Sequence, residues 1–303
     1  MNIVQKYLIA NRVSIFMIFV GLTSMTVAVL YKEGKPIRLA NTFLVFVSSF
    51  LIMAFSCVIN TLCDFYSGVD TKDNPNCDRT LFDYGMTPSL LVKFGFFNVI
   101  ATYTLVLPIV FSPLSSGLGM FKFLAIVTGL LLVSYFYTAP PFQLKYRALG
   151  WVGIASGVFF VPHLLYYANT FTFGFKESDL LLSLSTAGPL FCMFLYNGQT
   201  LRDIDSDEKA GILTHCVLLG KTVSYYFWFS FYIITMLYIT YISIIKNNIF
   251  LNLPWMSGIV VYKIYNLTKH NCDFNSKVKK LVPKVPFLCM MLLSVGVLVG
   301  TKN

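Results

Sequence analysis

Charged residues are few in this chain, and acidic residues are the scarcest of them. Only 13 of the 303 residues are Asp or Glu, and charged residues make up 12% of the total. Hydrophobic residues account for 56%, aromatic residues for 17%, and the mean hydropathy is +0.71. A composition this apolar excludes a disordered chain and argues against a soluble enzyme. The sequence therefore predicts a membrane protein.

Several motifs that would indicate other functions are missing. None of the seven cysteines has a partner at CxxC spacing, so neither a disulfide framework nor a zinc site is indicated. The chain has no P-loop and no GxGxxG turn, which argues against a nucleotide ligand. The net charge of +10 could suggest nucleic acid, but the Lys and Arg residues lie between apolar segments and not on one basic face. We expect no nucleic-acid partner.

Long hydrophobic runs fill most of the chain. Each is close to the roughly 20 residues that a helix needs to cross a bilayer, and each is too long for a barrel strand. Because only closed backbone hydrogen bonding survives in lipid, we expect an all-α, polytopic bundle of nine transmembrane helices forming a single domain over residues 1–303. The predicted spans are 13–31, 39–62, 89–112, 119–138, 150–170, 181–201, 222–245, 248–266 and 285–301.

Most of the acidic residues fall in two short clusters. A carboxylate near hydrocarbon is unfavourable by about 2.5–3.5 kcal/mol at a helix centre, so clustered acids in such a chain indicate a functional site. Four predicted spans separate the two clusters, an even number, which puts both on the same face of the membrane. The first cluster comprises Asp64, Asp70, Asp73, Asp78 and Asp83, and the second comprises Asp203, Asp205, Asp207 and Glu208.

The first cluster has a spacing that brings polar side chains together. Asn60 and Asp64 are four residues apart, so they share one face at the end of the second span. Gly68 can let the backbone turn and bring Asp70 back beside them.

The second cluster repeats this spacing. Gln199, Asp203 and Asp207 follow at four-residue steps, whereas Asp205 points elsewhere. Carboxylates held this close repel one another unless a cation intervenes. Mg²⁺ suits them, because it takes oxygen ligands and completes its shell with water and substrate phosphates.

Basic residues accompany both clusters and indicate an anionic ligand. Arg forks onto phosphate oxygens and Lys acts as a point charge, so cations beside a metal predict a diphosphate site. About sixteen of the 23 basic residues lie on the face of the acids, which the positive-inside rule assigns to the cytosol. We expect the later run Lys277, Lys279 and Lys280 to contact lipid headgroups or to set the orientation of the chain in the membrane, and not to be catalytic. The basic residues of the predicted diphosphate site are Lys72, Arg79, Lys145 and Arg202.

These motifs resemble those of the UbiA superfamily of intramembrane prenyltransferases. Asn60, Asp64 and Asp70 match the family's Asn-x3-Asp motif and its following Asp, and Asp203 and Asp207 match its Asp-x3-Asp motif. Further stretches are similar to the animal branch, which makes menaquinone-4, and more distantly to bacterial naphthoate prenyltransferases. They are Asp78-Arg-Thr-Leu, Tyr137-Thr, Leu144-Lys145-Tyr146, Ala148-Leu-Gly150, Arg202-Asp203, Ser206-Asp207 and Ala210-Gly-Ile.

The resemblance implies a nine-helix bundle around a central cavity that binds Mg²⁺ and an isoprenyl diphosphate. Tyr135 and Tyr137, beside the loop after the fourth span, are candidates to stabilise an allylic carbocation with their ring faces. Gln199 stands where the family often has Asn, and Trp151 stands where an acid is common. By this comparison the metal–diphosphate ligands are Asp64, Asp70, Asp203 and Asp207, and the diphosphate contacts are Asn60, Lys72, Arg79, Lys145 and Arg202.

The expected function is transfer of an isoprenyl group, geranylgeranyl by resemblance, to a naphthoquinone-type aromatic acceptor in menaquinone (vitamin K2) biosynthesis. We expect an endoplasmic reticulum or Golgi membrane, with the active-site loops in the cytosol. One alternative keeps the fold but changes the reaction to ubiquinone, haem or glycerol-phosphate prenylation. The others are a transporter with two related half-sites and a regulator that binds prenyl lipid; acids at span ends argue against the transporter.

Overall fold

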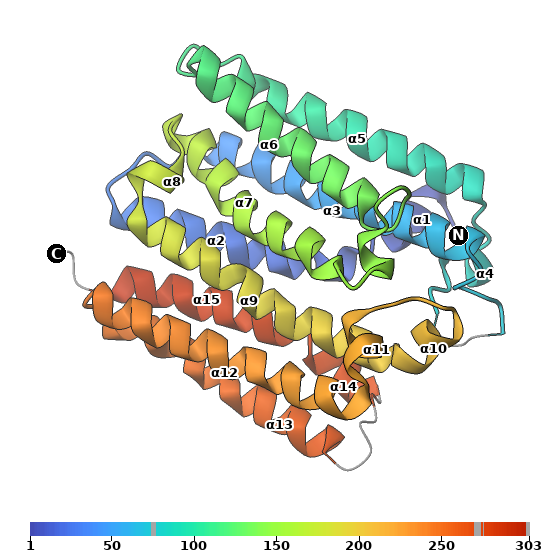
Figure 1. Cartoon of the computed structure of the whole chain (residues 1–303). Coiled ribbons are helices and arrows are strands. Elements are labelled where there is room, and N and C mark those ends of the chain that lie inside the picture. Colours follow the sequence, from blue (N-terminus) through green and yellow to red (C-terminus); the bar gives the residue numbers. More distant parts are fainter. Residues whose placement is uncertain (74–76, 270–273, 275, 301–303) are drawn as a thin grey trace.

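The computed structural model describes residues 1–73, 77–269, 274 and 276–300, and within them it is all-α with no β-strand. The long helices lie side by side in one bundle (Figure 1). Seven helical segments of this part are long and apolar enough to cross a membrane: α3 (Leu39–Tyr66), α5 (Pro88–Val110), α6 (Gly117–Phe136), α7 (Gly150–Thr170), α9 (Asp179–Arg202), α12 (Lys221–Ile245) and Lys277–Val299, which joins α14 (Ser276–Leu281) to α15 (Lys284–Val299).

The all-α membrane class is confirmed, but the expectation of nine full-length spans is wrong by two in the described residues. The first span is the 17-residue α2 (Phe16–Lys32), because Arg12 adopts a left-handed φ of 46° and η1 (Val13–Ile15) precedes the helix. The eighth divides into η3 (Ile249–Ser257), a 3-10 segment containing Pro254, and α13 (Gly258–Thr268). Pro has no backbone N–H and interrupts α-helical hydrogen bonding, which accounts for the break.

Helix packing sets the position of the central helices. α9 lies against α7 and α12, α2 lies against α15 and α7, and α3 lies against α5, α6 and α7. The contact between α9 and α12 is close because Gly198 faces the Trp228 ring, whose Nε1 donates to the carbonyl of Phe194 at 2.6 Å. α2, α3, α7 and α9 therefore surround a common interior.

Both acidic clusters emerge at the same end of the bundle, as the even number of spans predicts. α1 (Ile3–Ala10), α4 (Thr80–Asp83), α10 (Ile204–Lys209), α11 (His215–Leu219) and α14 gather at this end, and α8 (Gly174–Glu177) lies at the other (Figure 1). Two loops of the first end also meet: the backbone N–H of Ala148, after η2 (Leu144–Tyr146), donates to the carbonyl of Leu213 at 2.6 Å.

Gly296 allows α15 to approach the irregular eighth segment. A Cβ atom there would collide with the carbonyl oxygen of Phe250 and lie 2.8 Å from its carbonyl carbon. We expect Gly296→Ala to lower the free energy of unfolding by about 1–3 kcal/mol, since backbone atoms cannot move aside easily. Thermal unfolding in detergent measures this.

Gly129→Ala is the matched control, because a Cβ there meets nothing within 4 Å. Ala favours helix over Gly by about 1 kcal/mol, so this variant should be at least as stable as the wild type. Equal melting temperatures for the two variants would contradict the close approach of α15 and η3.

Candidate functional site

A large cavity opens at the end of the bundle that carries the acidic clusters. Its volume is about 1590 Å³, and its walls come mainly from α2, α3, α6, α7 and α9, with α15 at one side. Asp64 and Asp70 of the first motif and Asp203 and Asp207 of the second all line it. Residues that are distant in the sequence therefore face one shared space.

The Asp64 carboxylate of the cavity accepts hydrogen bonds from three side chains. Its Oδ2 accepts hydrogen bonds from Asn60 Nδ2 at 2.8 Å and Lys145 Nζ at 2.7 Å, and its Oδ1 accepts one from the Tyr146 hydroxyl. The Asp64 residue is 3% exposed. Since Asn60 lies one turn earlier on α3 and the other two come from η2, this carboxylate joins two elements.

Asp70 returns beside Asp64 through the turn that the sequence predicts at Gly68. Gly68 has a φ of 75°, and the backbone N–H groups of Val69 and Asp70 both donate to the carbonyl of Asp64, at 2.9 and 3.0 Å. The Oδ2 atom of Asp70 is buried without a hydrogen-bond partner. Burial, together with the charges of Asp64 and Asp78, raises the pKa of Asp70 to about 6.

Asp78 closes the other side of this loop. It forms an ion pair with Arg12 at 2.7 Å and accepts hydrogen bonds from the Thr61 hydroxyl at 2.6 Å and the Thr80 N–H at 2.9 Å. Burial opposes ionisation here, but Arg12 and the hydroxyls of Thr61 and Thr80 outweigh it and hold the pKa of Asp78 well below its usual range. The interaction fixes the loop to Arg12, the residue that precedes η1.

The second motif follows the end of α9. Asp203 is the C-cap of this helix and makes a two-pronged pair with its neighbour Arg202, with Arg202 Nε 2.6 Å from Asp203 Oδ1. Asp207 lies one turn further, on α10, and is 6% exposed. Burial raises the pKa of Asp207 to about 7, against the opposing effect of Lys145 and with the help of Asp203 and Asp64. The two motifs are thus close enough to influence each other's charge.

Three of the four cations predicted for the diphosphate site line the cavity, and one does not. Lys145, Arg79 and Arg202 line the cavity, whereas Lys72 is exposed and outside the lining. Arg79 makes a two-pronged pair with Asp83, at 3.0 and 2.8 Å, and its Nη1 donates to the carbonyl of Lys72 at 2.8 Å. Lys72 therefore supports Arg79 through its backbone and does not bring its ammonium group to the site.

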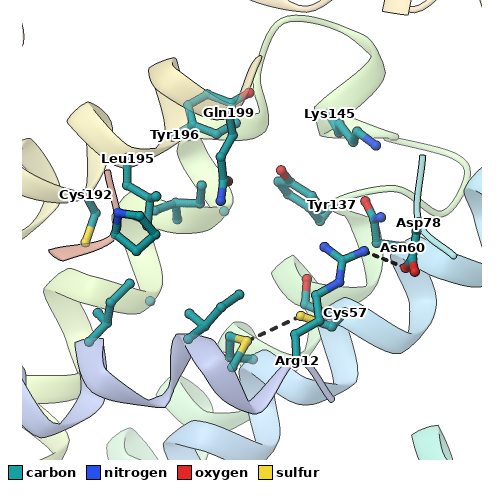
Figure 2. Close-up of a pocket in the computed structure, with 18 of the residues that line it drawn as sticks. Arg12, Cys57, Asn60, Asp78, Tyr137, Lys145, Cys192, Leu195, Tyr196 and Gln199 are labelled. Carbon is teal, nitrogen blue, oxygen red and sulfur yellow. Dashed lines mark hydrogen bonds and ion pairs between the residues drawn. The ribbon is translucent and has the colours of Figure 1, made fainter. Parts of the chain in front are cut away.

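Of the two tyrosines proposed to face a carbocation, the structure brings only Tyr137 to the cavity. Tyr135 is 40% exposed and lies outside the lining, because residues two apart near the end of a helix point in different directions. Tyr137 packs against Gly153 of α7, where a Cβ atom would come within 2.9 Å of the ring. Gln199 also lines the cavity, opposite Tyr137 (Figure 2), and Trp151 does not.

The acidic end fits a hard cation shared with a ligand. Among the described residues no three His, Cys, Asp or Glu side chains form a ready metal cluster. Mg²⁺ does not need one, since it is commonly held by one or two carboxylates together with substrate phosphates. The unpartnered Oδ2 of Asp70 and the raised pKa values of Asp70 and Asp207 belong to carboxylates that a nearby cation would stabilise in their ionised form.

Several site residues were not assigned from the sequence. Arg12 and Tyr146 help to hold the acidic loop, and neither was assigned to the site, although Tyr146 lies in a stretch that resembles the family. Asp78 was placed in the first acidic cluster but was given no role. Lys279 and Lys280 of α14 and Lys284 of α15 also line the cavity, although the sequence suggested lipid contact for the first two. Their approach depends on the packing of α15 against α2, which no local pattern reveals.

Below the polar end the cavity wall is apolar. Ile52 and Met53 of α3, Ile154 and Val158 of α7 and Leu195 of α9 line it, and Figure 2 shows Leu195 and Cys192 on the α9 wall. Such a chamber can hold a hydrocarbon chain away from water while the polar end holds a charged group.

The sequence is similar to those of one family of known proteins. The model of the UbiA prenyltransferase family matches residues 21–281. The UbiA prenyltransferase domain-containing protein 1 of Dictyostelium discoideum is 26% identical over 298 residues, which cover 93% of this chain and 84% of that protein. The zebrafish (Danio rerio) and human proteins of that name are 33% and 29% identical, over 65% and 55% of this chain, and the matches span only 56% and 47% of their lengths.

Solved structures support the same fold. A UbiA homolog from Archaeoglobus fulgidus, bound to GPP and Mg²⁺, matches with a TM-score of 0.68 at 17% identity, over 97% of this chain and 99% of that one. A structure of digeranylgeranylglyceryl phosphate synthase matches with a TM-score of 0.63 at 19% identity, over 99% of both chains. At these identities the likeness concerns the fold, and the family model covers most of the chain. This protein is therefore an integral, multi-pass membrane member of the UbiA prenyltransferase family, close to the animal UbiA prenyltransferase domain-containing protein.

Proposed function

We propose that this protein transfers an isoprenyl group, geranylgeranyl in the simplest case, from its diphosphate to a naphthoquinone-type acceptor in menaquinone biosynthesis. The proposal includes Mg²⁺ as the cofactor and an endoplasmic reticulum or Golgi membrane with the acidic end in the cytosol. Its support is family membership, the branch to which the related proteins belong, and the Mg²⁺ and prenyl diphosphates bound by archaeal homologs. One observation carries it: both Asp motifs face a single cavity with an apolar floor.

The acidic end would hold the diphosphate. In this proposal Asp64, Asp70, Asp203 and Asp207 hold magnesium, which supplies positive charge to the departing diphosphate as the allylic C–O bond breaks. Lys145 lies 2.7 Å from Asp64 and is held in place by that carboxylate, so its ammonium group is positioned before the substrate arrives. Asn60 donates a hydrogen bond to the same carboxylate at 2.8 Å and orients it.

The apolar chamber would hold the prenyl chain and protect the cation that forms. The diphosphate leaves with the electron pair of the C–O bond, and an electron-rich ring carbon of the reduced (hydroquinone) acceptor then attacks the allylic carbon. The ring carbon finally loses its proton to the released diphosphate. The aliphatic walls of α3, α7 and α9 exclude water that would otherwise capture the carbocation. The Tyr137 ring lines the cavity, and in this proposal it presents its face to the cation.

Product analysis tests the reaction directly. Purified protein in nanodiscs should convert geranylgeranyl diphosphate and a reduced naphthoquinone into a prenylated product detectable by mass spectrometry. EDTA should abolish the product and added Mg²⁺ should restore it. Prenylation of 4-hydroxybenzoate, haem or a glycerol phosphate in place of the naphthoquinone would reject the proposed acceptor. In sealed vesicles, uptake of the substrate without formation of any product would reject the enzymatic function.

Asp207→Asn tests the proposed role of Asp207 in metal binding with a substitution that keeps the shape of the side chain. Asp207 is not in an ion pair among the described residues, so the amide preserves its shape and leaves no buried cation unpaired, as Asp64→Ala would do at Lys145. We expect kcat to fall roughly 10²–10³-fold, comparable to the loss of one electrostatic contact to a transition state. Steady-state turnover measures the change.

Asp205→Asn is the matched control for this variant. Asp205 lies two residues away on the same helix, with a side chain 76% exposed and a Lys221 nitrogen at 3.8 Å. Its turnover should stay near the wild-type value. A similar fall in both variants would indicate a general effect of acidity on this loop and would contradict the role given to Asp207.

Cysteine labelling tests the orientation of the bundle. With the native cysteines replaced by Ser, we expect Asp73→Cys and Asp205→Cys to react with an impermeant maleimide from the cytosolic side. Lys176→Cys, on exposed α8 at the other end, should react only after the membrane is permeabilised. The reverse pattern would place the acidic end in the lumen and contradict the basic-residue distribution.

A further inference from the structure

Three lysines of the C-terminal part face the same cavity as the two Asp motifs. Lys279 and Lys280 lie on α14, and Lys284 is the first residue of α15. Their side chains are exposed, and they belong to the cavity wall opposite α3 together with Pro283 and Phe287. Figure 1 places α14 at the end of the bundle where the acidic loops emerge.

These lysines differ from the other cations of the cavity in their ion pairing. Within the described part of the chain, Lys279, Lys280 and Lys284 form no ion pair and donate no side-chain hydrogen bond. Each remaining cation of the lining contacts a carboxylate: Arg12 pairs with Asp78 at 2.7 Å, Arg79 with Asp83 at 2.8 Å, Lys145 with Asp64 at 2.7 Å and Arg202 with Asp203 at 2.5 Å.

This difference matters for an anionic ligand. A cation whose charge is already satisfied by a carboxylate attracts a second anion less strongly, because the two charges of the pair largely cancel at a distance. An exposed lysine keeps its full charge and three donors, and its flexible stem can move toward a ligand. The uncommitted positive charge of this cavity is therefore supplied by α14 and α15.

Lys279 also lies beside the second motif. It shares a small cleft of about 30 Å³ with Gln199 and Arg202 of α9. Two cations are thus neighbours there, while Asp203 is engaged by Arg202. Because Asp203 largely cancels the charge of Arg202, Lys279 supplies the uncompensated positive charge of this cleft.

We propose that Lys279, Lys280 and Lys284 bind the diphosphate group of the substrate and of the released product. This inference rests on the proposed function, and it adds a cationic wall on the side of the ligand away from the first Asp motif. Carboxylates and metal would hold one side of the diphosphate, and the three lysines would hold the other. A phosphate of an anionic lipid headgroup has the same chemistry, so the test must distinguish the two sources.

The test measures binding of inorganic diphosphate with Mg²⁺ by calorimetry, using full-length protein in phosphatidylcholine nanodiscs. Lys279→Gln, Lys280→Gln and Lys284→Gln should each raise the Kd about fivefold, and the triple variant more than tenfold, since each removes one charged contact. KM for the prenyl diphosphate should rise in parallel, with KM for the acceptor unchanged. Replacement of all three by Arg should restore most of the affinity.

Lys263→Gln and Lys269→Gln are matched controls, because Lys263 in the middle of α13 and Lys269 at its C-cap are exposed but do not line the cavity. They should leave the Kd unchanged. If the control variants raise the Kd as much as the test variants do, the effect comes from the overall surface charge, and the proposal is overturned.

A second comparison separates the ligand from lipid. If the lysines bind headgroups, the triple Gln variant will bind diphosphate normally in phosphatidylcholine and lose only an effect of added phosphatidylglycerol, which overturns the proposal. Binding is measured without turnover, so failure of the proposed reaction stays distinguishable. A protein that binds diphosphate through these lysines but prenylates no acceptor would refute the proposed function and keep this inference.

Discussion

The Asp64 carboxylate is the point on which the arrangement of the polar end depends. A buried carboxylate in a membrane bundle is stable only with partners, and Asp64 takes them from two elements: Asn60 of α3, and Lys145 and Tyr146 of η2. Its backbone carbonyl also accepts the N–H groups that return Asp70 to the site. The loop after η2 then reaches the loop before α11 through the hydrogen bond from Ala148 to Leu213. One residue thus ties the first motif to the loops that surround the second.

The cavity has a charged open end and an aliphatic interior, and the two parts suit different parts of a ligand. Charge gathers at the open end, where some carboxylates are neutralised by the protein's own cations and others, Asp70 and Asp207, lack an ion-pair partner among the described residues. Below them the walls are aliphatic, so a low dielectric strengthens electrostatic contacts at the boundary and keeps water out. A diphosphate attached to a hydrocarbon chain likewise has a charged end and an apolar end. The paired cations give the site its shape before a ligand arrives, and the lysines of α14 and α15 leave positive charge for the ligand itself.

Much of this architecture could be predicted from local pattern. The positions of the long helices follow from apolar length, and the pairing of Asn60 with Asp64 follows from the four-residue helical repeat. The predicted bounds of the spans were wrong where a single residue interrupts an apolar segment. Arg12 turns into the left-handed region and shortens the first span, and Pro254 breaks the eighth. Lys72 and Tyr135 have the right chemistry for the site, but both are exposed and lie outside the cavity lining, because the direction of a side chain at a helix end or in a loop is set by packing.

By itself the sequence determined that the protein is an all-α membrane bundle and that its two acidic motifs share one face. Hydrocarbon requires long, internally hydrogen-bonded helices, and an even number of crossings returns the chain to the same side. Only the tertiary structure decided which groups meet: Tyr146 on Asp64, Arg12 on Asp78, and the lysines of the last helices beside Arg202. The first two contacts join residues 82 and 66 positions apart, and the third lies between separate helices, so they exist only once side chains pack.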